Sequence, residues 1–144
     1  MNYRMLLKDH KKYCYALEME VRDYELDCES IVNNANYLHY IEHTRHKFCQ
    51  EAGVPFIEMH KAGLDAVVRK VELEYLSSLR SGDTFVVYLG LERKGPRFVF
   101  NEDIFRKDGT PVLASVVTAV VLKDGKLSRG DELAEVFKPF LNRR

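Results

Sequence analysis

The chain has 144 residues, the usual size of one domain with its own hydrophobic core, so we expect a single domain spanning residues 1–144. It carries 22 basic and 22 acidic residues, which gives a formal net charge of zero. This balance argues against the long-range electrostatic field of a protein that binds nucleic acid or an anionic membrane. An anionic ligand would need a local basic patch.

The cysteines and the apolar runs indicate the compartment. Cys14, Cys28 and Cys49 are odd in number and lack CxxC spacing, which is typical of free thiols in a reducing compartment. Charges interrupt residues 1–13 every few positions, unlike a signal peptide. The longest apolar run, residues 116–122, is far shorter than the roughly 20 residues that span a bilayer. We therefore expect a soluble, cytoplasmic protein.

The first part of the chain predicts one strand and one long helix. Residues 15–21 alternate between apolar and charged side chains, as in a half-buried strand. From Asn36 to about Ala52, apolar residues recur at three- and four-residue intervals, which predicts an amphipathic helix that Gly53 and Pro55 end. A helix of roughly 16 residues is about 24 Å long, enough to lie along a whole sheet.

After the helix, apolar residues again recur at every second position, as in strands. Turn-forming residues separate four alternating or apolar runs, and Asp108-Gly109 and Asp124-Gly125 are hairpin-type dipeptides. The expected strands are 71–75, 85–91, 97–105 and 112–122. We expect them to form a meander, followed by a short helix or irregular tail at residues 131–141.

These elements predict the α+β class, with a curled, mainly antiparallel sheet of about five strands wrapped around one long central helix. The helix covers only one face of such a sheet. Uncovered faces and edge strands usually find a partner, so we expect self-association.

Residues 21–45, VRDYELDCESIVNNANYLHYIEHTR, resemble the signature of the hot-dog-fold acyl-CoA thioesterases of the 4-hydroxybenzoyl-CoA thioesterase type. In that family, an aspartate in the loop after the first strand precedes a V-N-N-A-x-Y-L-x-Y-x-E stretch that opens the central helix. The matching residues are Asp27, Val32, Asn33, Asn34, Ala35, Tyr37, Leu38, Tyr40, Glu42 and Arg45. The resemblance implies a hot-dog fold and a homodimer that pairs into a tetramer. It implies no cofactor beyond the coenzyme A of the substrate.

By this resemblance, Asp27 and the backbone N–H of Asn34 are the catalytic groups of a thioester hydrolase. A thiolate leaves readily, because a thiol has a pKa near about 8.5. The site must then polarise the carbonyl, which suits the free N–H groups at a helix start. Asp27 would act as general base on water or attack the carbonyl to form an anhydride, and both routes stay open. Without the resemblance, a solvated loop acid and ordinary helix capping would explain these residues.

Four further residues are expected to contact the substrate. Asn33 belongs to the helix start, and Tyr37 can line an acyl pocket, although aromatic residues at helical spacing more often belong to the core. Lys94 and Arg97, in a basic turn, are candidates for the phosphates of coenzyme A. Glu42 is the second candidate for the catalytic acid.

The chain departs from the family pattern within the Asp27 loop. The family commonly has glycine three residues after the aspartate and often histidine at the fourth, where this chain has Ser30 and Ile31. Because glycine adopts backbone conformations that serine rarely adopts, we expect this substitution to change the loop that aims the carboxylate.

Two patterns have spacings that metal sites also show. The carboxylates are Asp23, Glu25, Asp27 and Glu29, which would share one side of an extended segment, and the imidazoles are His39, His43 and His46. The carboxylates lack the Gly-bearing loop of a cation site, and the histidines lack the HExxH arrangement. We therefore expect no metal, and a polar helix face at the histidines.

The preferred interpretation is an acyl-CoA thioesterase that releases free acid and coenzyme A. One alternative is an acyl-(acyl carrier protein) thioesterase, which a basic surface patch would favour because carrier proteins are acidic. Another is a non-catalytic acyl-CoA-binding hot-dog module, which an apolar tunnel without a facing carboxylate would favour.

Overall fold

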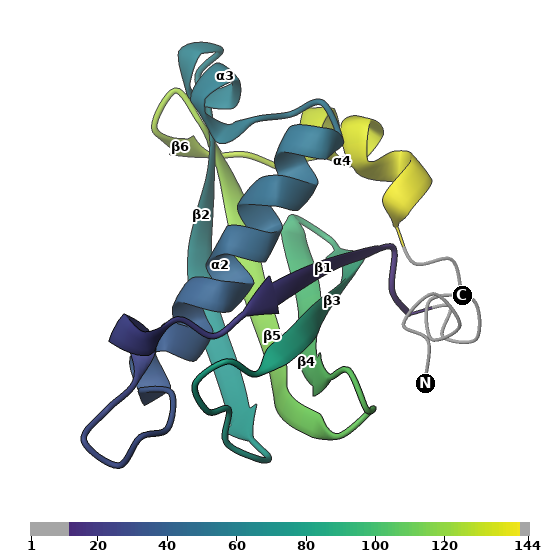
Figure 1. Cartoon of the computed structure of the whole chain (residues 1–144). Helices are drawn as coiled ribbons and strands as arrows, with labels where there is room; N and C mark the ends of the chain where they lie inside the picture. The colour runs from purple at the N-terminus through teal and green to yellow at the C-terminus, as the bar shows by residue number, and fades with distance from the viewer. Residues whose placement is uncertain (1–11, 142–144) are drawn as a thin grey trace.

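In the computed structural model, which describes residues 12–141, one long helix lies across the concave face of a curved sheet (Figure 1). The strands are β1 (Tyr15–Glu20), β2 (Leu64–Tyr75), β3 (Thr84–Lys94), β4 (Arg97–Arg106), β5 (Pro111–Lys123) and β6 (Lys126–Leu127). The helices are α2 (Asn34–Glu51), α3 (Phe56–Lys61) and α4 (Asp131–Phe137), with 3-10 turns η1 (Asp23–Glu25) and η2 (Lys138–Phe140). This is the hot-dog arrangement, and it confirms the predicted α+β class.

The strand order is β1–β3–β4–β5–β2, all pairs are antiparallel, and the short β6 pairs with β5. Strands β3 to β5 form a meander, but β2 pairs with β5 instead of β3. The predicted four-strand meander is therefore wrong for its first strand, β2. Alternation along one segment identifies a strand without identifying its neighbour.

The starts of α2 and β2 and the presence of helix α3 differ from the sequence-based expectation. Helix α2 begins at Asn34, two residues before the predicted start, because the Asn33 side chain caps it by accepting a bond from the Ala35 N–H at 3.0 Å. Helix α3, which follows Pro55, was not expected. Strand β2 begins at Leu64, because a bulge between Val68 and Lys70 interrupts the alternation that would have revealed its first half.

The core fixes α2 against the sheet. Its buried residues are Tyr37, Tyr40, Ile41, Thr44, Phe48 and Cys49. Near the C-terminal end of α2, Phe48 stacks on Phe137 of α4, and near its middle Tyr40 contacts Phe85 of β3. Burying each such ring contributes about 1.5–3 kcal/mol. The helix start is therefore positioned by a rigid element.

Within residues 12–141, no helix combines the length and the apolarity needed to cross a membrane. The signal-peptide prediction concerns residues 1–13 and lies almost entirely outside the described residues. Cys14, Cys28 and Cys49 are free, and Cys49 is buried.

Candidate active site

Asp27 lies in a short hairpin between η1 and α2. Leu26 pairs with Val32, and the Asp27 N–H donates to the Ile31 carbonyl at 2.8 Å. A loop of this length is commonly closed by a residue in the left-handed region. Ser30 supplies that residue with a φ of +63°, the conformation that glycine favours. Serine at this position therefore holds a left-handed turn, and a change in the aim of the carboxylate relative to the family stays a prediction.

The two oxygens of the Asp27 carboxylate have different surroundings. Oδ1 accepts the Glu29 N–H at 2.8 Å and the Ile31 N–H at 3.4 Å. Oδ2 accepts no hydrogen bond from any residue between 12 and 141. The side chain is partly exposed. One oxygen thus orients the group, and the other is available to a water molecule or to a substrate.

The first turn of α2 leaves one N–H group available. The Ala35 N–H is bound by the Asn33 side chain, and the Asn36 N–H donates to the Asn33 carbonyl at 2.9 Å. The Asn34 N–H has no acceptor in the described part of the chain, and its residue is exposed. The carbonyl of Asn34 accepts the Tyr75 hydroxyl of β2 at 3.3 Å. This helix start can donate to a developing oxyanion.

Buried Glu25 ties the hairpin to the helix. Its carbonyl accepts the Asn33 N–H at 3.0 Å and the Asn36 side chain at 2.8 Å. Its carboxylate accepts the Arg22 N–H at 2.8 Å and the Tyr40 hydroxyl at 2.9 Å. Burial acts to raise the pKa of Glu25, but the bonds from Arg22 and Tyr40 outweigh it and lower the pKa. Glu25 is therefore a structural anion.

The predicted one-sided row of carboxylates is wrong, because Asp23–Glu25 forms a 3-10 turn instead of an extended segment. Asp23 accepts the Ser81 hydroxyl at 2.6 Å, whereas Asp27 accepts N–H groups of its own hairpin. Across residues 12–141, no three His, Cys, Asp or Glu side chains are grouped as metal ligands would be.

Tyr37 supports the hairpin from inside the core. Its hydroxyl accepts the Leu79 N–H at 3.0 Å, while the Leu79 carbonyl accepts the Val32 N–H at 2.9 Å. Burial raises the pKa of Tyr37, and the negative charge of nearby Asp27 acts in the same direction. Only 3% of Tyr37 is exposed, so it lies behind the loop. Its assignment to an acyl-binding site stays a prediction, as does that of Asn33, whose side chain caps α2.

The basic turn lies at the other end of the sheet. Arg93 donates to Asp131 of α4 at 2.6 Å, and Figure 1 shows the β3–β4 turn near α4, away from the start of α2. Strand β3 alone is roughly 33 Å long. One chain therefore does not bring Lys94 and Arg97 to Asp27, and their contact with coenzyme A stays a prediction.

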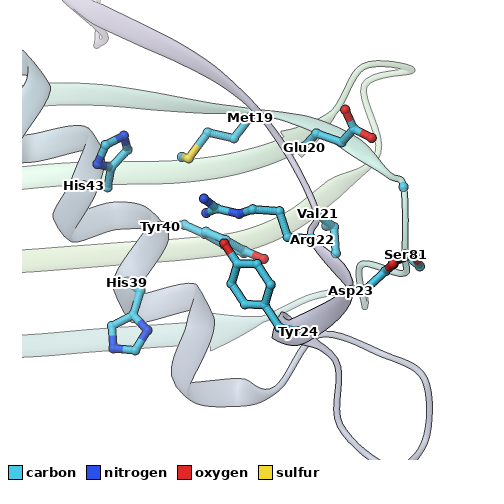
Figure 2. A pocket seen from close by; sticks show the side chains of 11 residues that line it. Met19, Glu20, Val21, Arg22, Asp23, Tyr24, His39, Tyr40, His43 and Ser81 are labelled. Carbon is cyan, nitrogen blue, oxygen red and sulfur yellow. Dashed lines mark hydrogen bonds between the residues drawn. The ribbon is translucent and has the colours of Figure 1, made fainter.

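The three histidines divide between two pockets. An open pocket of about 780 Å³ lies between the end of β1 and α2. Figure 2 shows His39 and His43 on its helix side and Arg22 and Tyr24 opposite. His46 lines a different pocket and pairs with Glu42 at 3.8 Å. Glu42 lies about 12 Å along the helix from Asn34. That spacing makes it a poor acid for a carbonyl bound at the helix start.

The sequence patterns missed two buried acids, Glu102 and Asp103, of which Glu102 is the more deeply buried. Glu102 of β4 is fully buried, and its Oε1 lies 3.4 Å from Nη1 of Arg45. Oε2 has no partner in the described part of the chain. Burial raises the pKa of Glu102 to about 8, although Arg45 acts to lower it. The sequence could have revealed that Glu102 is buried. It lies on the same every-second-residue pattern as Phe98, Phe100 and Ile104, whose side chains face the core.

Comparison with known proteins identifies the family. Residues 21–141 match the thioesterase-like superfamily. The chain is 36% identical over 110 residues to the chloroplastic acyl-acyl carrier protein thioesterase ATL3 of Arabidopsis thaliana, covering 75% of this chain and 58% of that protein. It is 32% identical over 93 residues to the putative acyl-CoA thioesterase YneP of Bacillus subtilis (strain 168), covering 64% of this chain and 67% of that protein.

Among solved structures, the hypothetical protein AQ1494 from Aquifex aeolicus superposes with a TM-score of 0.79 at 31% identity, covering 85% of this chain and 98% of that one. The protein therefore belongs to the thioesterase-like superfamily and has the hot-dog fold. It spans about 58% of the length of the plant relative that it matches.

Proposed function

We propose that this protein hydrolyses acyl thioesters, releasing the free acid and the carrier thiol. One observation carries the proposal. The Asp27 hairpin fixes one carboxylate oxygen and leaves the other free, and it leads directly to a helix start whose first N–H, that of Asn34, has no partner among the described residues. A thioester carbonyl bound at that N–H would have its oxygen polarised as the carbonyl carbon is attacked.

Two routes suit this arrangement. In the first, Asp27 takes a proton from water, the water oxygen adds to the carbonyl carbon, and the C–S bond breaks as the leaving thiolate takes the proton held by Asp27. In the second, a carboxylate oxygen of Asp27 attacks the carbon and expels the thiolate, and water then cleaves the resulting anhydride. Both need the free carboxylate oxygen and neither needs a metal.

Coenzyme A is our first choice of carrier. An acidic carrier protein would need a broad basic surface, but the net charge is zero and Arg93 of the basic turn is already paired with Asp131. Acyl carrier protein is the second choice, supported by the similarity to ATL3. Comparing kcat/KM for one acyl group on the two carriers distinguishes them, and a preference of tenfold or more for the carrier protein would reverse our order.

We also propose a homodimer formed along β2. Strand β2 is a sheet edge of 12 residues with open backbone groups, and exposed apolar side chains lie along and just beyond it. They are Val67, Val68, Val71, Tyr75 and Leu76. A second copy pairing antiparallel with this edge would continue the sheet. Assembly of two dimers into a tetramer and a cytoplasmic location stay predictions.

Asp27→Asn tests the proposed chemistry, because it preserves the size of the side chain and removes its charge and basicity. We expect kcat/KM on acyl-CoA esters to fall by about 100-fold or more, measured as release of the coenzyme A thiol. Asp23→Asn is the matched control, since it changes a nearby acid that bonds Ser81. Equal rates for wild type and Asp27→Asn would refute the catalytic assignment. No turnover of any thioester by the wild type would favour the binding module.

A further inference from the structure

An apolar pocket of about 370 Å³ lies between α2 and the open edge of the sheet. We call it the α2–β2 pocket. Helices and the sheet both line it. The lining residues include Leu38 of α2, Val68 and Val71 of β2, Phe98 of β4, Met59 of α3 and Phe137 of α4. Neither Asp27 nor the basic turn lines it. The catalytic proposal therefore leaves this pocket without a role.

The bulge in β2 gives the pocket much of its apolar wall. Val68 and Val71 are three residues apart, so regular alternation would put their side chains on opposite faces of the sheet. The register shift between Val68 and Lys70 inserts one residue and brings both valines to the pocket side. They are 43% and 36% exposed in the single chain.

Along α2, the pocket begins one helical turn beyond the proposed oxyanion donor, which does not itself line it. Leu38 lies one helical turn after Asn34. On the facing strand, Tyr75 donates to the Asn34 carbonyl, and Val71 is four residues earlier. A chain attached to a carbonyl at Asn34 would therefore enter between Leu38 and Val71.

The far end of the pocket is closed by elements outside the signature segment. Ala66 lines it where β2 pairs with Val121 of β5, and Phe56 of α3 lies over the end of α2, with its ring 4.7 Å from that of His46. Leu133 and Phe137 of α4 complete the wall. The pocket therefore has a defined depth.

Polar groups at the pocket are few and mostly peripheral. Glu42 and His46 are paired with each other, and each side chain is more than half exposed. Arg45 is mostly buried and held by Glu102. The remaining wall favours a hydrocarbon, and each methylene that leaves water for such a wall improves binding by about fourfold.

The dimensions indicate the length of the occupant. Leu38 and Cys49, both lining residues, are about 16 Å apart along the helix axis. Carbon–carbon bonds of about 1.5 Å at tetrahedral angles advance roughly 1.25 Å each along an extended chain. A methylene occupies a volume close to the roughly 30 Å³ of a water molecule. Length and volume both correspond to about twelve carbons inside the pocket, in addition to those between Asn34 and Leu38.

We infer that the α2–β2 pocket holds the acyl chain of the substrate and that its wall of α3 and α4 sets the chain length. The substrate class is the thioesters of unbranched fatty acids of about twelve carbons or more, in preference to aromatic acyl groups, which would fill only the entrance. This inference rests on the proposed function and specifies its substrate.

The test compares chain-length profiles of variants at the far end. Values of kcat/KM are measured for butanoyl-, octanoyl-, dodecanoyl-, hexadecanoyl- and benzoyl-CoA. Wild type should be more active on dodecanoyl-CoA than on butanoyl-, octanoyl- or benzoyl-CoA. Ala66→Phe should lower the dodecanoyl-to-butanoyl ratio about tenfold or more, because the ring displaces several methylenes. Phe56→Ala should raise the hexadecanoyl-to-dodecanoyl ratio about fourfold, and it remains informative if Ala66→Phe fails to fold.

Ala62→Phe is the matched control, because Ala62 is exposed at the end of α3 and does not line the pocket. Its profile should equal that of the wild type. Hydrolysis with one and the same profile in all four proteins would overturn the inference and leave the proposed function standing. Preference of the wild type for benzoyl-CoA would overturn it as well.

A binding measurement tests the pocket assignment independently of catalysis. Dodecanoate binding is measured by calorimetry on Asp27→Asn protein, alone and combined with Ala66→Phe or Ala62→Phe. If no thioester is hydrolysed but Ala66→Phe weakens binding about tenfold relative to Ala62→Phe, the proposed function fails and the pocket assignment holds. Equal dodecanoate affinity in the three proteins would overturn the pocket assignment.

Discussion

The direction of the Asp27 carboxylate depends on the backbone of a neighbouring residue. Ser30 closes the hairpin with a φ of +63°, and a left-handed conformation costs an ordinary L-residue about 1–2 kcal/mol. The bonds from the Glu29 and Ile31 N–H groups to Asp27 form only when the hairpin is closed in this way. The strained backbone of Ser30 thus helps to keep the Asp27 carboxylate oriented.

Replacing Ser30 by glycine is expected to relieve this strain. Ser30→Gly should increase the free energy of unfolding by about 0.5–1 kcal/mol and preserve kcat/KM, because glycine adopts a positive φ freely. Thermal and urea unfolding measure the first quantity. Ser30→Ala is the control, since it keeps the Cβ atom and removes only the hydroxyl. A loss of activity in Ser30→Gly that is shared by Ser30→Ala would instead assign a role to the hydroxyl.

The buried carboxyl group of Glu102 should make the stability of the protein depend on pH. Its pKa is raised from 4.5 to about 8 in the folded protein, so the folded state holds a proton that the unfolded state releases. The resulting stabilisation is full below about pH 4.5 and is lost as the pH rises through about 8. Between pH 6 and 9, the Tm of wild type should fall relative to that of Glu102→Gln, which cannot ionise.

Glu74→Gln controls for this comparison, because Glu74 is an exposed acid on β2. Its Tm should follow that of the wild type over the same pH range. A constant difference in Tm between wild type and Glu102→Gln would show that Glu102 does not titrate there.

At the scale of single elements, the start of α2 must present the Asn34 N–H in a fixed direction. Asn33→Ala removes the side chain that caps the Ala35 N–H, at a cost of about 1 kcal/mol. The first turn should then fray, so we expect kcat to fall several-fold with a smaller change in KM. Asn33→Ser should restore both stability and kcat, because serine also caps helices. Rescue of stability without rescue of kcat would mean that the asparagine side chain contacts the substrate.

Elements with strong local periodicity were predictable from the sequence. Helix α2 was found because its apolar residues recur at helical spacing, and strand β1 because its apolar and charged residues alternate. The helix signature led to Asp27. Strand β2 was half missed because its bulge breaks the alternation, and its outward face is exposed. Its pairing with β5 depends on contacts far apart in the sequence, which a local pattern does not encode.

The site was predictable in part for the same reason. Asp27 and Asn34 are close in sequence, so a single hairpin relates them. The positive φ of Ser30, the support from Leu79 and the α2–β2 pocket all depend on the folded chain. Sequence patterns at those residues carry no sign of these roles.

At the scale of the whole molecule, the exposed edge of β2 should decide the oligomeric state. We expect the wild type to be a dimer in sedimentation velocity. Val67→Glu combined with Leu76→Glu should shift it toward monomer, because both side chains are more than 40% exposed along and just beyond the edge, and like charges would then face each other. Leu127→Glu, which changes an exposed leucine on β6, is the control and should remain dimeric. A monomeric wild type would refute the proposed interface.

The support of the hairpin by Leu79 couples the site to a distant part of the chain. Leu79 accepts from Val32 and donates to Tyr37, and Arg80 bridges to Ile31, so the connection between β2 and β3 holds the Asp27 hairpin from outside. That connection joins a strand at one sheet edge to one near the other. Each transient opening of it would remove the support that Leu79 gives the hairpin, so the alignment of the carboxylate should depend on how long this connection stays closed. Amide exchange at Val32 and at Leu79 would report one shared opening event.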